Sequence, residues 1–224
     1  MSRIFLIHAL RDSVEPARAA MARGWPEAEI VNLLDDSLSA DLAKAGKLDD
    51  AMIARFVRLG RYARDQGADG ILFACSAFGP AIEAVVAELP IPVLKPNESA
   101  FRAALAHGRR IGLLVTFAGS LAPLTEELQT MAGPGLELHA RIVPGALAAL
   151  QAGDGTAHDR KIAETAAHLP PVDALVLGQF SMARAALALE GRTVYTTPDA
   201  AVADLKKRVG VSARGSSKSR HPPG

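Results

Sequence analysis

Short apolar runs alternate along most of the chain with segments in which apolar residues recur every three or four positions. The runs are typical of buried strands, and the three-to-four spacing is typical of helices that bury one face. The expected strands are residues 3–9, 28–34, 70–75, 90–94, 110–115, 136–143, 173–178 and 193–196. The expected helices are residues 12–23, 49–66, 80–89, 101–107, 121–131, 146–151, 159–168, 183–189 and 200–208, with an acidic loop before residue 49. This alternation predicts an α/β fold with parallel sheets.

The two halves of the chain carry similar segments at the ends of these strands. Residues 6–13 and 113–120 each run from a strand through a polar turn to a serine, and residues 73–78 and 177–182 both lead from a strand into a helix. The spacing from His8 to Cys75 is 67 residues, and that from Thr116 to Gln179 is 63. The pattern predicts two pseudo-symmetric parallel-sheet α/β halves with the site between them. Chance similarity of short strand–turn motifs is the alternative.

The expected first half covers residues 1–96, and a helix at about residues 200–210 is expected to pack back on it. The second half covers residues 97–199. Residues 211–224 are basic, rich in Ser, Gly and Pro, and without a hydrophobic period, which predicts a disordered basic tail.

Charge and composition exclude several classes of protein. Six of the 25 basic residues lie from Asp204 onward against one acid, which leaves residues 1–203 with a net charge of −4. With only 4% aromatic residues as well, the chain lacks the basic, ring-rich face of a nucleic-acid-binding protein. No apolar run approaches the ~20 residues that span a bilayer, and the N-terminus lacks a signal-peptide pattern. A single cysteine cannot form an internal disulfide, so a cytoplasmic protein is expected.

The single cysteine, Cys75, is the sharpest chemical candidate. It follows an apolar run and precedes Gly79 and Pro80, a typical helix start. Free N–H groups at a helix start stabilise a thiolate and can also hold a carboxylate. The alternative is a small buried hydrophobic residue without chemistry. Polar residues also follow other expected strands at His8, Thr116 and Gln179, where parallel sheets bind ligands.

Other chemical motifs are missing from the sequence. The histidines show no metal-ligand spacing with one another or with Cys75, and neither a phosphate-binding loop nor a dinucleotide fingerprint nor a nucleophile elbow is found. We therefore expect no metal and no cofactor. Lys95 and Arg184 are candidates for binding a second carboxylate, although most such side chains are ordinary solvated charges.

Four segments together resemble the aspartate/glutamate/hydantoin racemase superfamily, which also contains arylmalonate decarboxylase and maleate isomerase. They are CSAFGP at residues 75–80, GLLVTFAGS at residues 112–120, LGQFS at residues 177–181 and TTPD at residues 196–199. The resemblance implies an isomerase that binds a small carboxylic acid or amino acid between two α/β halves, without a cofactor. It leaves a homodimer open.

In the racemases of this superfamily, one cysteine from each half flanks the α-carbon, and hydrogen-bond donors stabilise the enolate-like intermediate. By this resemblance Cys75 is catalytic. The expected substrate-binding residues are Ser76, Asn97, Thr116, Ser120, Gln179 and Ser181.

The sequence departs from the superfamily at Gln179, which stands where the second cysteine is expected. A glutamine side chain neither gives nor takes a proton at neutral pH. Three interpretations stay open. Cys75 works with another group, of which His8 is the best placed because it titrates near neutrality; the enzyme uses one thiol for decarboxylation of a malonate-type acid or for isomerisation; or the chain is a non-catalytic binding protein. In the single-cysteine decarboxylases, the retained thiol belongs to the second half.

Overall fold

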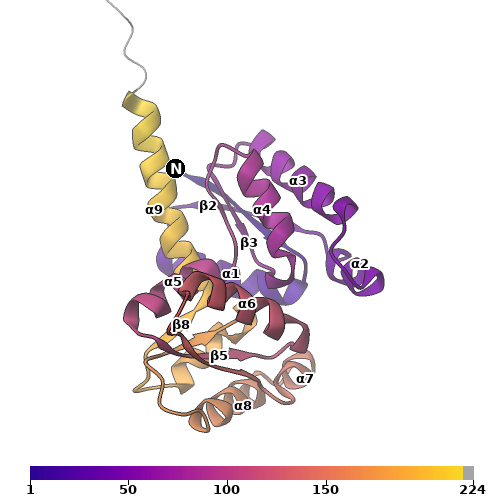
Figure 1. Ribbon diagram of the computed structural model, residues 1–224. Coiled ribbons are helices and arrows are strands. Elements are labelled where there is room, and N and C mark those ends of the chain that lie inside the picture. Colours follow the sequence, from indigo (N-terminus) through magenta and orange to yellow (C-terminus); the bar gives the residue numbers. More distant parts are fainter. Residues whose placement is uncertain (219–224) are drawn as a thin grey trace, which may run out of the picture. The chain divides into compact units, whose positions relative to one another are not determined.

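The computed structural model describes residues 1–218 and divides into two compact units (Figure 1). Unit 1 consists of Met1–Lys95 together with the described residues from Ala201 onward, and unit 2 is Pro96–Ala200. The sequence pattern places the first division after residue 96 and the second after residue 199, one residue away in each case. Both units are parallel α/β folds, so the expected fold class is confirmed.

The sheet of unit 1 has four parallel strands in the order β2-β1-β3-β4. These strands are β1 (Arg3–His8), β2 (Glu29–Leu34), β3 (Gly70–Phe73) and β4 (Val93–Leu94). His8 pairs with Leu34, and Ile7 pairs with Phe73, so the carboxyl ends of the three long strands share one edge of the sheet. The proline-flanked β4 lies at the side edge of the sheet, where a missing backbone donor is tolerated.

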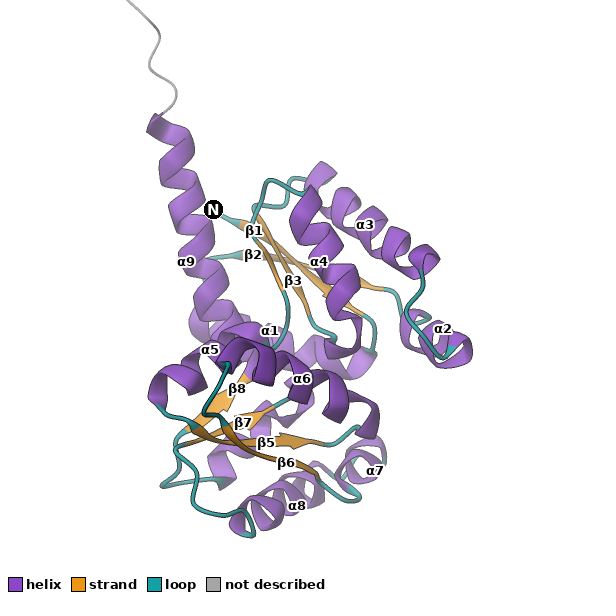
Figure 2. Cartoon of the chain, viewed as in Figure 1, coloured by secondary structure: helices purple, strands orange, loops and turns teal. Residues whose placement is uncertain are grey.

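Helices cover both faces of this sheet (Figure 2). On one face, Phe56 of α3 (Asp50–Asp65) stacks on Phe73 of β3 and on Phe78, with ring centroids 5.4 and 4.7 Å apart. The helix α4 (Gly79–Glu88) buries residues in the same cluster. On the other face, Leu205 and Val209 of α9 (Thr197–Lys218) approach Gly70 so closely that an added Cβ would clash. The remaining elements are η1 (Arg11–Ser13), α1 (Val14–Gly24), α2 (Leu38–Ala45) and η2 (Ser76–Phe78).

Two segments of unit 1 differ from the sequence-based expectation. The helix α2 lies in the stretch expected to be a loop, because an eight-residue helix with only Leu38 fully buried leaves no clear hydrophobic period. The helix α9 continues to Lys218 although disorder was expected from residue 211. An existing helix lengthens without a new nucleus, so weakly patterned residues can extend it. Residues 219–224 of the expected tail lie outside the described residues.

Unit 2 repeats the topology, with strand order β6-β5-β7-β8. Its strands are β5 (Arg110–Val115), β6 (Glu137–Ile142), β7 (Ala174–Leu177) and β8 (Val194–Thr196). One face of the sheet packs on α5 (Glu98–His107) and α6 (Leu121–Ala132). The other packs on α7 (Ala146–Gln151), α8 (Gly155–Ala167) and η4 (Phe180–Ala188), which follow the three-residue turn η3 (Ala118–Ser120) in the chain. The segment expected to be an α-helix at residues 183–189 is thus largely the 3₁₀ segment η4.

The backbone contacts of the two units match position by position. The N–H of Ala74 donates to Ile7 O at 2.9 Å, and the N–H of Gly178 donates to Leu114 O at 2.9 Å. Ser13 and Ser120 are both buried and both precede the first helix after the central strand. This correspondence supports an internal duplication over chance similarity of short motifs. Within residues 1–218, none of the helices is both long and apolar enough to cross a membrane.

Candidate active site

Cys75 lies two residues beyond β3, at the residue that precedes η2. Its backbone is extended (φ −137°, ψ 120°), which turns the chain from the strand into η2 and α4. The side chain is partly exposed and packs against the buried cluster that contains Leu38, Phe73 and Phe78. Cys75 therefore sits at the boundary between the apolar interior of unit 1 and its surface.

Burial raises the pKa of the Cys75 thiol to about 11, and the Ala77 N–H and the Ser39 hydroxyl, which favour the thiolate, oppose the rise. The backbone N–H that favours the thiolate is that of Ala77, but the loss of hydration outweighs its effect. With this pKa, Cys75 holds its proton at neutral pH. The sequence pattern did not identify Ser39, because it lies on the unpredicted helix α2.

His8 is fully buried at the end of β1. Its Nδ1 lies 2.8 Å from Ser13 Oγ, and its Nε2 lies 3.1 Å from Asn32 Oδ1. Burial lowers the pKa of His8, and the hydrogen bond with Asn32 opposes that shift. Since both ring nitrogens are engaged inside unit 1, the geometry favours a structural role for His8 over that of a base for Cys75.

In unit 2, the side-chain oxygen of Gln179 accepts three hydrogen bonds. The donors are the Thr116 N–H at 2.6 Å, the Thr116 hydroxyl at 2.8 Å and the Phe117 N–H at 3.2 Å. Three converging donors identify the accepting atom as the oxygen of the amide. We call these three groups the Thr116–Phe117 donor set. Within the described residues, the amide nitrogen of Gln179 has no hydrogen-bond partner.

Cys75 and Gln179 occupy equivalent positions in the two units. Each lies two residues after the last residue of the third strand in its unit, and each precedes a 3₁₀ segment with an extended backbone. One unit thus presents a thiol and the other an amide whose oxygen is already satisfied. The duplicated backbone is symmetric, but its chemistry is not.

The other candidate residues fall into several environments. Ser120 and Asn97 are buried in unit 2, and Asn97 Oδ1 lacks a partner among the described residues. Ser76 is partly exposed in η2, and Ser181 is partly exposed in η4, two residues after Gln179. Among all candidates, the structure thus joins Thr116 to Gln179 by direct hydrogen bonds.

The two candidate carboxylate-binding cations have acidic partners of their own. Lys95 Nζ lies 2.9 Å from Glu83, and Arg184 Nε lies 2.8 Å from Asp159. Over residues 1–218, the histidine, cysteine and acidic side chains form no group of three or more that could hold a metal ion.

Comparison with known proteins gives both a family and a set of similar folds. The family model described as Asp/Glu/Hydantoin racemase matches residues 10–205. Allantoin racemase from Klebsiella pneumoniae superposes with a TM-score of 0.76 at 24% identity, covering 95% of this chain and 89% of that one. Aspartate racemase from Picrophilus torridus superposes with a TM-score of 0.72 at 14% identity, covering 94% and 95%.

A point mutant of arylmalonate decarboxylase, in a form associated with a sulfate ion, superposes with a TM-score of 0.69 at 18% identity and covers 93% of each chain. No curated protein sequence matches. These structural similarities, all below 25% identity, concern the fold. Because the family model covers most of the chain, the protein belongs to the Asp/Glu/hydantoin racemase family.

Proposed function

We propose that this protein is a cofactor-independent, racemase- or isomerase-like enzyme. It acts at the carbon next to a carboxylate in a small acid or amino acid, with Cys75 as the proton-transfer group. The observation that carries this proposal is the position of Cys75 between a parallel strand and η2, where the Ala77 N–H and the Ser39 hydroxyl both favour the thiolate. Membership of a racemase family supports the class of reaction.

The protonation state of Cys75 decides which half of a proton transfer is easy. With a pKa of about 11, roughly one thiol in 10⁴ is a thiolate at pH 7. A protonated thiol is ready to give its proton to a carbanion. To remove a proton instead, Cys75 must first lose its own, and the Ala77 and Ser39 donors then stabilise the thiolate.

Gln179 takes no part in proton transfer in this proposal, because an amide does not titrate near neutrality. The Thr116–Phe117 donor set fixes its oxygen, so its N–H groups remain to donate to a carboxylate or to the developing oxyanion. Gln179 is therefore proposed as a substrate-binding residue, with Thr116 as the group that holds it.

Decarboxylation of a malonate-type acid is the second candidate, and the protonated state of Cys75 favours it. In that reaction the bond between the α-carbon and one carboxyl group breaks, and carbon dioxide leaves. The electron pair remains on the α-carbon as an enediolate. The Cys75 S–H then gives its proton to that carbon, and the thiolate regains a proton from water. One proton donor suffices for this sequence.

Proton NMR in deuterium oxide tests the proposal with a panel of amino acids, hydantoins and malonate-type acids. We expect loss of an α-proton signal or release of carbon dioxide with at least one compound, and abolition of that activity by Cys75→Ser. Chiral analysis of the product then separates racemisation from one-sided chemistry. Turnover that survives Cys75→Ser would refute the role of the thiol. Binding of a panel compound in a thermal-shift assay without any exchange, with affinity unchanged in Cys75→Ser, would instead indicate a binding protein.

A further inference from the structure

The helix α2 is short and holds few buried contacts. It has eight residues, begins after Ser37 and ends at Gly46, whose φ of 71° stops the helix. Leu38 is its single fully buried residue, and it packs in the same cluster as Phe73 and Phe78, which Cys75 borders. An isolated helix of this length is unstable in water, so its place in unit 1 depends on side-chain contacts with other elements.

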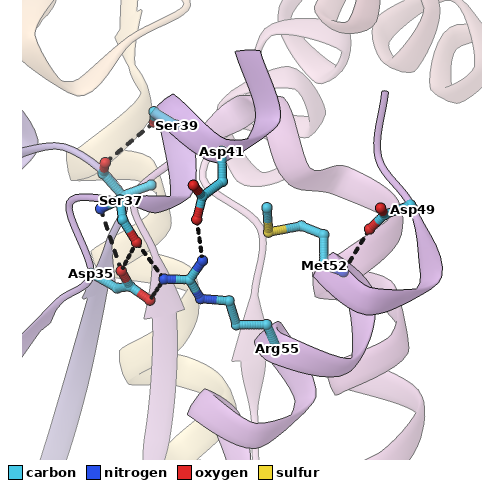
Figure 3. Close-up of polar contacts among 8 residues, drawn as sticks. Asp35, Ser37, Ser39, Asp41, Asp49, Met52 and Arg55 are labelled. Carbon is cyan, nitrogen blue, oxygen red and sulfur yellow. Dashed lines mark hydrogen bonds and ion pairs between the residues drawn. The ribbon is translucent and has the colours of Figure 1, made fainter. Parts of the chain in front are cut away.

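Arg55 supplies the strongest of these contacts (Figure 3). From α3, its guanidinium reaches Asp41 Oδ2 at 2.7 Å, Asp35 Oδ2 at 2.5 Å and Ser37 Oγ at 2.5 Å. We call these four residues the Arg55 clamp. The side chains of Arg55 and Asp35 are only 27% and 23% exposed, so water weakens this pairing less than it weakens a surface ion pair.

The charge state of the clamp agrees with its geometry. Burial on its own raises the pKa of Asp35, but hydrogen bonds from Ser37 and Arg55 together hold it below the ordinary value. Asp35 and Arg55 therefore stay ionised at neutral pH. The helix α3, which carries Arg55, is itself held in place: Asp49 caps it by accepting the Met52 N–H at 2.9 Å, and its Phe56 is buried in the core.

Ser39, at the second position of α2, connects the clamp to Cys75. Its hydroxyl donates to Ala9 O at 3.2 Å. Ala9 lies two residues after Ile7 of β1, and Cys75 lies two residues after Phe73 of β3. Because Ile7 and Phe73 are paired, Ser39 is held beside Cys75, and its hydroxyl favours the thiolate. A serine hydroxyl has one proton to donate. When Cys75 is a thiol, that proton goes to Ala9 O; when Cys75 is a thiolate, the hydroxyl can turn to the sulfur.

We infer that Ser39 is a positioning residue that sets the reactivity of Cys75, and that the Arg55 clamp keeps α2 closed over the thiol. The inference rests on the proposed function only in taking Cys75 as the reacting group. Its test measures the reactivity of the thiol directly and needs no substrate. This inference can therefore fail while the proposed enzyme activity holds, and the proposed activity can fail while this inference holds.

The experiment is the rate at which Cys75 reacts with dithiodipyridine, a small neutral disulfide, as a function of pH in the full chain. As the single cysteine, Cys75 is the sole site of reaction. In Ser39→Ala we expect the thiol pKa to rise by about one unit. Below that pKa, the tenfold loss of thiolate is partly offset by higher nucleophilicity, which leaves a rate about three- to fourfold lower. Ser39→Thr keeps the hydroxyl and should restore the wild-type profile.

Arg55→Met should have the opposite effect. If α2 opens, the thiol pKa falls from about 11 toward its ordinary 9.0, and the rate below the pKa rises about tenfold. Loss of the Arg55 charge leaves Asp35 and Asp41 unpaired, which by itself slows the reaction, so an acceleration reports exposure of the thiol. Arg61→Met is the matched control, because Arg61 lies on the same helix and pairs with Glu88 of α4. Its rate should equal that of the wild type.

Hydrogen exchange separates local opening from unfolding. Arg55→Met should speed amide exchange in residues 38–45 and leave that of α3 and α4 unchanged. Wild-type reactivity and wild-type exchange of α2 in Arg55→Met would overturn the clamp. An unchanged pH profile in Ser39→Ala, in a variant that unfolds at the wild-type temperature, would overturn the role of Ser39. A loss of reactivity in Ser39→Thr equal to that in Ser39→Ala would show that shape rather than the hydroxyl matters.

Discussion

The Thr116–Phe117 donor set now donates to the side-chain oxygen of Gln179. Removal of that side chain should free these donors to bind an anion from solution. In the wild type, one amide oxygen serves two consecutive backbone N–H groups and the Thr116 hydroxyl, at 2.6 to 3.2 Å. In Gln179→Ala those donors lose their acceptor. Thr116 is only 6% exposed, so its donors depend on what replaces that oxygen.

The size of the effect follows from the number of bonds. A typical hydrogen bond contributes about 1 kcal/mol net, and an unsatisfied buried donor costs more. Gln179 itself is partly exposed, so water can enter and reduce the penalty. We therefore expect Gln179→Ala to lower the free energy of unfolding by about 1–2 kcal/mol, or the melting temperature by about 3–6 °C.

Acetate should restore most of this loss, since its carboxylate offers the oxygen that the donors lack. At ten times its dissociation constant, a ligand stabilises the folded state by about 1.4 kcal/mol. The assay is a thermal melt in sodium acetate and in sodium chloride at equal ionic strength. The quantity of interest is the acetate-specific gain of the variant beyond that of the wild type.

Two further variants make the comparison specific. Gln179→Glu keeps an oxygen within reach of the donors and should gain nothing from acetate beyond the wild type. Gln179→Met fills the space without an acceptor, so it should be destabilised and not rescued. If Gln179→Ala melts at the wild-type temperature in chloride and gains no more from acetate than the wild type, the Thr116–Phe117 donor set does not stabilise unit 2 and does not bind anions.

Two further predictions concern unit 1. Because burial lowers the pKa of His8, the unfolded chain binds a proton at His8 more readily than the folded chain does. The contribution of His8 to the free energy of unfolding is therefore full above pH 6.5. It falls as the pH drops below that value, with a slope of at most about 1.4 kcal/mol per pH unit. Urea denaturation between about pH 5.5 and pH 8 should show this loss of unfolding free energy in the wild type and not in His8→Gln. An equal dependence of the unfolding free energy on pH in the two proteins would contradict the prediction. Gly60→Ala should destabilise the packing of α3 on α4 by about 1–3 kcal/mol, because the new Cβ would lie 2.5 Å from Val85 Cγ1; Gly79→Ala, with open space around it, is the control, and equal unfolding midpoints would contradict the clash.

The strands were predictable because each central strand is buried on both faces. The runs at β1, β3, β5 and β7 are uninterrupted in apolar character, and the structure buries nearly every residue in them. The duplicated topology was predictable because similar strand ends recur at similar spacing in the two halves of the chain. The helix α2 was not, because Leu38 alone among its residues is fully buried, and Arg55 holds the segment by polar contacts with Asp41 on α2 and with Asp35 before it.

The location of the candidate residues at strand ends was predictable, but the pKa of Cys75 and the hydrogen bonds of Gln179 were not. Cys75 and Gln179 lie at strand ends, as their flanking residues indicate. The raised pKa of Cys75 depends on how tightly the neighbouring side chains exclude water, and no spacing in the sequence encodes that packing. The three hydrogen bonds to Gln179 depend on the direction of two backbone N–H groups, which the strand pattern does not specify.

The asymmetry between the two units has a stereochemical consequence under the proposed function. A duplicated backbone places a residue at the same point of each unit, but Cys75 is able to exchange a proton there and Gln179 is not. A substrate carbon that meets one thiol exchanges its hydrogen on one face. With an amino acid of one hand, deuterium should then replace the α-proton while the configuration is retained. A racemic product would instead require a second proton donor, and neither the fixed amide of Gln179 nor the buried, doubly hydrogen-bonded ring of His8 is suited to that task.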